Sequence, residues 1–179
     1  MDEPDPQVVA AARSGDLGAF ETLVRRYQGD VWRLCFHLLH NESAADDATQ
    51  EAFVRVFRFL RRYRGDSKFS TWLFQVARNC AVDEMRRAGR RSTLARRVEG
   101  PEVPAPDSTL GIEVREAVAS LAMDLREPVV LIDVFGLSYH EVSDILGLPE
   151  GTVKSRVHRA RTLLAAALRP GAEGDARET

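Results

Sequence analysis

The 179-residue sequence lacks several features that define common protein classes. It has two cysteines, Cys35 and Cys80, too few for a disulfide framework or a cysteine-rich zinc module. No apolar run approaches the roughly 18 residues of a membrane-spanning helix, and the N-terminal MDEPDPQ is acidic where a signal peptide is basic. These absences predict a cytoplasmic protein without membrane insertion, and no pattern calls for a metal or a cofactor.

Signals for β-strands are also missing, because no segment alternates apolar and polar residues and no Asn-Gly turn joins two such segments. Hydrophobic residues make up 44% of the chain, and they recur mostly at spacings of three and four. The sequence therefore predicts an all-α protein. Helices are expected over about 6–40 in two pieces, 44–62, 69–89, 112–123, 128–135, 138–146 and 151–168, with Pro128 in the first turn of its helix and Phe57 in a core stripe.

Residues 92–111 interrupt this pattern with three prolines, two glycines and almost no periodicity. We predict two small helical domains, 1–91 and 112–169, joined by a flexible linker over 92–111 and followed by a disordered tail over 170–179. A 20-residue linker reaches about 60 Å when extended, so the two domains need not touch in a fixed way.

Net charge is −2, but the charges are strongly segregated along the chain. Residues 61–97 hold 11 basic and 3 acidic side chains, and residues 151–169 hold 5 basic and no acidic ones. Residues 98–150 between them hold 11 acidic side chains and only 2 basic ones. Two basic segments indicate two contacts with a polyanion, whereas the acidic segments are free to meet another partner.

The second basic segment is the last helix of a predicted helix-turn-helix motif. Ser138 and Glu141 form a capping box at a helix start, Gly147 suits the left-handed end of that helix, and a basic helix follows directly. In this motif the second helix enters the DNA major groove, where basic and hydroxyl side chains meet bases and phosphates. A plain helical hairpin with a basic exposed face is the alternative.

The first basic segment places aromatic residues among arginines, as in Lys68-Phe69-Ser70-Thr71-Trp72. Aromatic rings in a positive field suit unpaired DNA, since bases stack on them whatever their identity. Trp72 also fits an apolar core stripe, whereas Phe69, expected near the loop, is less committed to the core. Cys35, His37 and His40 carry side chains of the kinds that bind zinc. On a helix, however, Cys35 and His37 point to different faces, which argues against a shared zinc site.

Two stretches resemble conserved regions of bacterial sigma factors. DDATQEAFVRVFRFLRRYRGDSKFSTWLFQVARNCAVDEMRR is similar to the second region, and LREPVVLIDVFGLSYHEVSDILGLPEGTVKSRVHRARTLL is similar to the fourth. Their order, with only a short linker between them, resembles the extracytoplasmic-function (ECF) group of the sigma-70 family. The resemblance implies a non-enzymatic factor that binds core RNA polymerase and promoter DNA, and that also has an anti-sigma factor as a partner.

The resemblance also implies roles for individual residues. The face expected to bind core polymerase consists of Asp47, Gln50, Glu51 and Arg55. The residues expected at the −10 element are Arg64, Lys68, Phe69, Thr71, Trp72, Arg78, Asn79, Arg86 and Arg87. Those expected at the −35 element are Thr152, Lys154, Ser155, Arg156, His158, Arg159 and Arg161. A helix-turn-helix regulator that acts without polymerase remains the alternative function.

Overall fold

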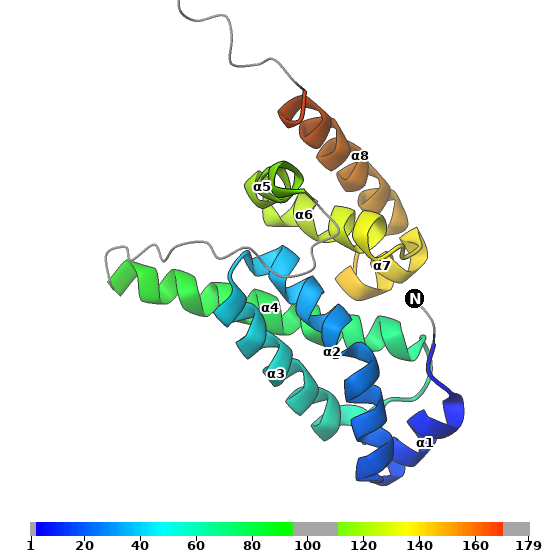
Figure 1. Cartoon of the computed structure of the whole chain (residues 1–179). Coiled ribbons are helices and arrows are strands. Elements are labelled where there is room, and N and C mark those ends of the chain that lie inside the picture. The colour runs from blue at the N-terminus through cyan, green and yellow to red at the C-terminus, as the bar shows by residue number, and fades with distance from the viewer. Residues whose placement is uncertain (1–2, 95–110, 170–179) are drawn as a thin grey trace, which may run out of the picture.

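The structure, a computed structural model, describes residues 3–94 and 111–169, and all regular secondary structure within these ranges is helical (Figure 1). None of these helices has the length and apolar character needed to cross a lipid bilayer. The elements are α1 (Pro6–Ser14), α2 (Leu17–Leu39), α3 (Glu42–Phe59), the 3₁₀ turn η1 (Leu60–Arg62), α4 (Phe69–Leu94), α5 (Ile112–Ser120), α6 (Met123–Val129), the π-helical turn η2 (Val130–Val134), α7 (Tyr139–Leu146) and α8 (Glu150–Ala167).

In the N-terminal half, residues 3–94, helices α2, α3 and α4 form a bundle with α1 against one end (Figure 1). The helix starts follow from local chemistry, because Asp16 and Asn41 accept hydrogen bonds from the backbone N–H groups of Ala19 and Ala44. The core contains fully buried apolar side chains from all three long helices, among them Leu34, Val56 and Phe74.

Two predicted boundaries in this half need correction. The helix expected over 44–62 is α helical only from Glu42 to Phe59 and then tightens into the 3₁₀ turn η1. Helix α4 does not end near residue 89 but continues to Leu94, so the first residues of the predicted linker are helical. The remainder of the predicted linker, 95–110, and the predicted tail, 170–179, lie outside the described residues.

In the C-terminal half, residues 111–169, the prediction of one helix over 112–123 is wrong. The backbone is extended at Leu121 and Ala122, with ψ angles of 142° and 146°, and this break separates α5 from α6. Pro128 does not start a helix but lies inside α6. Proline has no N–H for the helical ladder, and the wider turn η2 begins two residues after it.

The helix-turn-helix prediction is confirmed. Ser138 and Glu141 make both hydrogen bonds of the capping box, and Gly147 ends α7 with a φ angle of 65°. Only three residues separate α7 from α8. Val153, Val157 and Ala160 are completely buried, so they fix the inner face of α8 and turn the other face outward.

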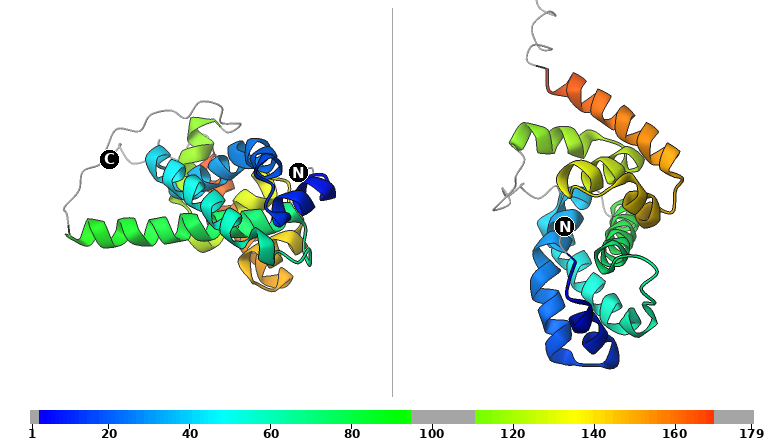
Figure 2. Two further views of the ribbon diagram at one scale, coloured as in Figure 1. Left: turned by 90° about the horizontal axis from the view of Figure 1, so that it is seen from below. Right: turned by 90° about the vertical axis from the view of Figure 1, so that its right-hand side faces the viewer.

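The two halves are in contact in this structure. The C-terminal half lies against α2 and α4, and one cluster of buried side chains runs through both halves (Figures 1 and 2). The Phe74 and Phe135 rings meet edge to face, with centroids 5.0 Å apart. The Arg126 guanidinium donates across the junction to the Leu38 carbonyl at 2.8 Å. Helix α8 nevertheless remains on the outside of the assembly.

Candidate nucleic-acid and polymerase interfaces

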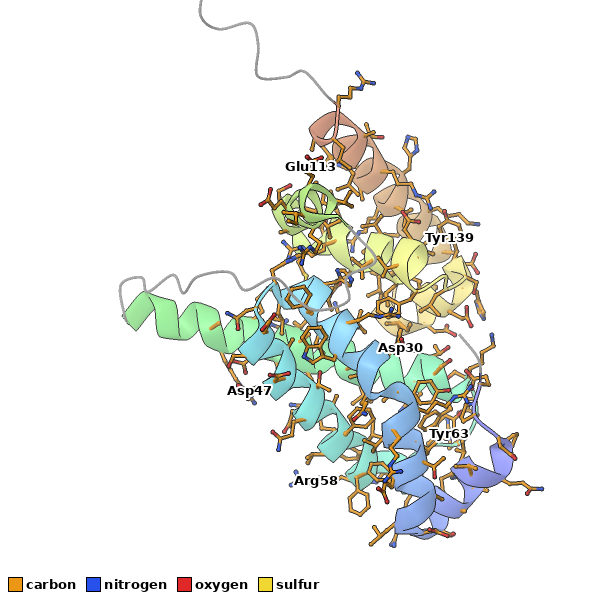
Figure 3. All side chains as sticks on the ribbon, in the orientation of Figure 1. Asp30, Asp47, Arg58, Tyr63, Glu113 and Tyr139 are labelled. Atoms are coloured by element: carbon orange, nitrogen blue, oxygen red, sulfur yellow. The ribbon has the colours of Figure 1, made fainter. Side chains whose placement is uncertain are left out.

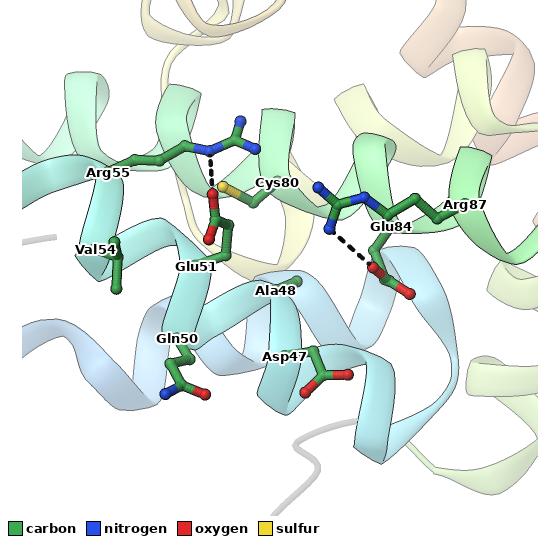
Figure 4. Close-up of a pocket in the computed structure, with 9 residues that line it drawn as sticks. All are labelled: Asp47, Ala48, Gln50, Glu51, Val54, Arg55, Cys80, Glu84 and Arg87. Carbon is green, nitrogen blue, oxygen red and sulfur yellow. Dashed lines mark hydrogen bonds and ion pairs between the residues drawn. The ribbon is translucent and has the colours of Figure 1, made fainter.

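The four side chains predicted to bind polymerase lie together along α3. With Cys80, Glu84 and Arg87 of α4 they border a shallow cavity of about 260 Å³ (Figure 4). Asp47 and Gln50 are exposed, whereas Glu51 and Arg55 are half-buried. Figure 3 shows Asp47 and Arg58 near opposite ends of this helix, both reaching outward.

Within this group, Arg55 connects α3 to α4. Its guanidinium donates to Glu51 at 2.7 Å and to Asp83 of α4 at 3.0 Å, and these hydrogen bonds raise its pKa. It therefore fixes the direction of the Glu51 carboxylate and ties α3 to α4. Asp47 and Gln50 are the exposed polar groups of this face, and 40% of the Glu51 side chain remains accessible as well.

An exposed apolar patch continues this face and was not predicted from the sequence. Val54 and Phe57 lie on the Gln50 side of α3, at spacings of four and seven residues from Gln50. The prediction of Phe57 as a core residue is wrong, because half of its surface is exposed, although it touches the Phe20 ring edge-on. The spacing from Gln50 was the available signal. An exposed aromatic beside polar side chains is typical of a protein-binding surface.

Phe69 is not an accessible stacking platform in this structure. It is the first residue of α4 and is only 3% exposed. Its ring packs among those of Tyr27, Tyr63 and Trp72, with centroid distances of 5.8, 5.9 and 6.0 Å. Trp72 is half-buried in the same cluster. The expectation that Phe69 was less committed to the core is therefore corrected.

The start of α4 is covered by the N-terminal segment. The Glu3 carboxylate accepts from the backbone N–H of Phe69 at 3.0 Å, from that of Ser70 at 3.4 Å and from the Ser70 hydroxyl. Thr71, a predicted −10 residue, is buried in the first turn, and its hydroxyl has no hydrogen-bond partner. The first turn of α4 thus presents little free polar surface.

Two predicted −10 residues, Lys68 and Arg78, bind acidic side chains of the C-terminal half. The Lys68 ammonium lies 2.7 Å from Glu141, and the Arg78 guanidinium donates to both carboxylate oxygens of Glu127 at 2.7 and 2.8 Å. Burial favours a higher pKa for Glu141, but hydrogen bonds from Lys68 and Ser138 outweigh it and lower the pKa to about 2. Glu127 was not singled out from the sequence, where it was one acid among eleven in its segment.

The other predicted −10 residues lie on exposed surface. Arg64 pairs with Asp66 at 2.8 Å within its own loop, and Arg87 approaches Glu84 at 3.5 Å. Asn79 and Arg86 are exposed on α4. The predicted set is therefore divided between an accessible part and a part that the chain itself occupies.

The residues predicted to read the −35 element lie on the outward side of α8. Lys154, Ser155, His158 and Arg159 are exposed, while Thr152 and Arg156 are half-buried at the edge of the helix packing. This is the arrangement expected of a recognition helix, whose early outward residues meet base edges.

Two residues of α8 are held by neighbouring elements. The Arg161 guanidinium donates to both oxygens of Asp133, at 3.1 and 2.6 Å, and so links α8 to η2. Lys154 lies over the Tyr139 ring at 5.6 Å and 3.5 Å from Glu150. These contacts orient α8 within its half, and they leave His158 and Arg159 projecting from it.

The sulfur and imidazole groups of α2 are internal. Cys35 is fully buried and His37 nearly so, and burial raises the pKa of the Cys35 thiol to about 12. Among residues 3–94 and 111–169, no group of three or more histidine, cysteine, aspartate or glutamate side chains is arranged to hold a metal ion.

Comparison with known families gives matches in both halves. Residues 23–91 match the family described as Sigma-70 region 2, and residues 112–164 match Sigma-70, region 4. The two matches occur in the order that the resemblance of the sequence predicted.

Individual relatives match over nearly the whole chain. The RNA polymerase sigma-H factor of Pseudomonas aeruginosa is 33% identical over 94% of this chain and 95% of its own length. The ECF RNA polymerase sigma factor SigE of Mycolicibacterium smegmatis is 39% identical over 91% of this chain and 67% of its own length. The sigma factor RpoE from Bartonella quintana, solved with the anti-sigma factor NepR, superposes with a TM-score of 0.73 at 27% identity, covering 83% of this chain and 96% of that one.

Proposed function

The chain belongs to the ECF group of the sigma-70 family, and we propose that three of its surfaces each make a different contact during transcription initiation. It is a transcription initiation factor and not itself an enzyme. In our proposal α3 binds core RNA polymerase, the loop before α4 and the outer side of α4 contact the −10 element, and α8 reads the −35 element.

The outward face of α8 is the observation that carries the DNA-binding part of this proposal. Its exposed side chains are basic or hydroxyl-bearing, and its apolar side is buried against α6 and α7. Major-groove recognition needs such donors on a helix that the rest of the domain holds firmly. The alternative of a regulator that acts without polymerase is not favoured, because the match over residues 23–91 gives the N-terminal half a sigma-factor identity as well.

The partners follow from the same proposal. Core polymerase and promoter DNA are the working partners, and an anti-sigma factor is the regulatory one, as the complex of the Bartonella relative with NepR supports. We place the protein in the cytoplasm, where polymerase acts.

Run-off transcription with purified core polymerase tests the function directly. The protein is expected to produce discrete start sites on a pool of genomic templates, each preceded by shared −10 and −35 sequences. Transcripts that do not differ from those of core polymerase alone would contradict the proposal.

Replacing Arg159 with alanine is expected to weaken initiation at promoters with a −35 element by about 1–3 kcal/mol, because an exposed donor of α8 is lost. Run-off yield against promoter concentration measures the effect. Arg25→Ala, which removes an exposed arginine from α2, is the matched control and should leave the yield unchanged. Reduced polymerase binding by the Arg159 variant would show that α8 has a different task.

Replacing Gln50 and Glu51 together with alanine is expected to weaken binding to core polymerase about tenfold or more, because both belong to the α3 face. Fluorescence anisotropy of labelled protein titrated with core polymerase measures the affinity. The control removes an exposed glutamine and an exposed glutamate elsewhere, Gln7→Ala with Glu113→Ala, and should bind like the unmodified protein. Equal affinities of the two double variants would exclude α3 as the docking face.

A further inference from the structure

The start of α4 is capped by Glu3, a residue that lies 66 positions before Phe69 in the sequence. The Glu3 carboxylate accepts hydrogen bonds from the backbone N–H groups of Phe69 and Ser70 and from the Ser70 hydroxyl. Figure 1 shows the N-terminal segment passing the start of α4 before it enters α1. A negative charge at this end of a helix also complements the helix dipole. Glu3 therefore acts as the N-terminal cap of α4 from a distant part of the chain.

The residue directly before α4 cannot provide this cap. Asp5, Asp16 and Asn41 each cap the helix that follows them directly, as short polar side chains usually do. The position before α4 is occupied by Lys68, whose ammonium group donates hydrogen bonds and accepts none. Without Glu3, the first N–H groups of α4 would depend on water or on another partner.

The contacts of neighbouring residues hold Glu3 in this place. Pro4 is buried, and a residue that precedes proline is restricted to extended backbone conformations. Asp5 caps α1 by accepting from the Gln7 N–H at 2.8 Å. The Arg26 guanidinium of α2 donates to the Glu3 carbonyl at 3.4 Å. The N-terminal segment is therefore anchored to α1 and α2 as well as to α4.

The cap lies at one end of the loop that joins η1 to α4. The Tyr63 hydroxyl donates to the Ser67 carbonyl at 2.6 Å and so closes this loop from within. The Tyr63 ring also packs edge to face on the Phe69 ring, with centroids 5.9 Å apart. Burial raises the pKa of Tyr63, and the negative charge of Glu3 raises it further, as expected for a carboxylate near this side chain. Glu3 thus acts on the loop and on the first turn of α4 together.

Several residues proposed above as −10 contacts lie in this loop or in the first turn of α4. They are Arg64, Lys68, Phe69, Thr71 and Trp72. DNA binding needs such side chains at fixed positions, and a segment that is already ordered loses less entropy when its ligand binds. A contact that orders the start of α4 therefore also strengthens the DNA contacts proposed for it.

We propose that Glu3 is a positioning residue for −10 recognition, which caps α4 and thereby holds the loop and the first turn of α4 in the arrangement that contacts the −10 strand. The inference rests on the proposed function, because it takes this loop and α4 to contact the −10 element. The Glu3 carboxylate itself would repel a DNA phosphate. The sign of its effect therefore distinguishes two roles, because a positioning residue strengthens DNA binding despite its charge, whereas a repelling charge weakens it.

The substitution E3A in the complex with core polymerase tests the inference. The probe is a single-stranded oligonucleotide that carries the −10 element of a promoter mapped by run-off transcription, and fluorescence anisotropy measures its affinity. E3A is expected to bind this strand about fivefold less tightly, because the start of α4 is less ordered. Unchanged or tighter binding by E3A would overturn the inference. If the unmodified complex bound this strand no better than a scrambled one, the proposed function would be contradicted instead.

Glu21→Ala is the matched control, since it removes an exposed glutamate from α2 and changes the net charge equally. It is expected not to weaken binding of the −10 strand. Both variants should bind core polymerase and −35 duplex DNA like the unmodified protein, and the melting temperature of E3A should fall by only about 4 °C or less. Equal losses of −10, −35 and polymerase binding by E3A would show a general loss of folded structure and would overturn the inference.

Hydrogen–deuterium exchange of the free protein tests the cap itself. The Phe69 and Ser70 amides donate to Glu3, so peptides that cover the start of α4 should exchange faster in E3A than in the unmodified protein. Peptides that cover α8 should exchange at the same rate in both proteins. Equal exchange at the start of α4 would show that Glu3 does not order this segment, and the inference would fail.

Ser70 provides a further test through a double-mutant cycle. Its side chain is buried, and its hydroxyl donates to Glu3. S70A is expected to weaken binding of the −10 strand about twofold. The variant with both substitutions should bind no more weakly than E3A alone, because the two substitutions remove the same contact. Losses that multiply would show that the residues act independently, which contradicts a shared cap.

Discussion

Replacing Phe69 with alanine is expected to lower the free energy of unfolding by about 3–5 kcal/mol, since a buried aromatic ring is removed from a packed cluster. The ring contacts those of Tyr27, Tyr63 and Trp72, and α4 begins at this residue. Chemical denaturation followed by circular dichroism measures the loss. The same substitution at Phe57, whose ring is half exposed, is the matched control and should cost about 1 kcal/mol or less.

The Phe69 variant also separates two roles that the ring could have. If it is as stable as the unmodified protein and yet fails to open promoter DNA, the ring stacks on a base and its burial in this structure is incidental. The structure favours the opposite outcome, in which −10 function and fold are lost together because the aromatic cluster supports the loop before α4.

Acidification below neutral pH is expected to destabilise the fold through His37 of α2 and His40, which caps the C-terminal end of α2. Burial, with the nearby charges of Arg33 and Arg115, lowers the pKa of His37 to about 4. Burial and the Arg126 charge lower the pKa of His40 to about 4 as well. The unfolded chain takes up these protons near pH 6.5, so stability falls as pH drops below 6.5 and the loss levels off near pH 4.

The slope of this loss is at most about 1.4 kcal/mol per pH unit for each histidine, and less for the partly exposed His40. Denaturation curves between pH 7 and pH 4 measure it, and His37→Gln is expected to flatten the dependence. Glu141 acts in a separate window, because its lowered pKa of about 2 means that its contribution is lost only as pH falls below about 4.5. A pH profile unchanged by His37→Gln would assign the acid sensitivity to other groups.

Elements specified by local chemistry were predictable from the sequence. The capping box at Ser138 and the glycine at 147 set the limits of α7 through contacts within four residues, and both were assigned correctly. The turn at Leu148-Pro149-Glu150 predicted the start of α8 to within one residue, and its predicted end near Leu168 also lies within one residue of the observed end. The outward residues of α8 could also be predicted, because helical periodicity alone decides which side of a helix its apolar residues occupy.

Features that depend on distant residues were not predictable in this way. The break at Ala122 and the position of Pro128 inside α6 depend on how this segment packs, and Pro128 taken alone indicated a helix start. The burial of Phe69 depends on its contact with Tyr27, 42 positions away. No pattern near Phe69 in the sequence indicates this contact. The roles of the predicted polymerase and promoter residues remain predictions that the experiments above address.

The junction between the halves illustrates the same limit. Charge counts showed an acidic segment between two basic ones, and that pattern fitted an external partner as well as an internal one. Glu127 and Arg78 lie 49 positions apart, and only the folded chain shows that they form a two-point pair. The predicted polymerase face is an intermediate case, because its four residues do lie together on α3, whereas the exposed Phe57 was assigned to the core.

The order of the two halves along the chain has a consequence for biosynthesis. Residues 3–94 leave the ribosome first, and α4 with its arginines is complete before Glu127 and Glu141 have been added. In the nascent chain Lys68 and Arg78 therefore cannot form their pairs with Glu141 and Glu127 until translation has passed those two glutamates.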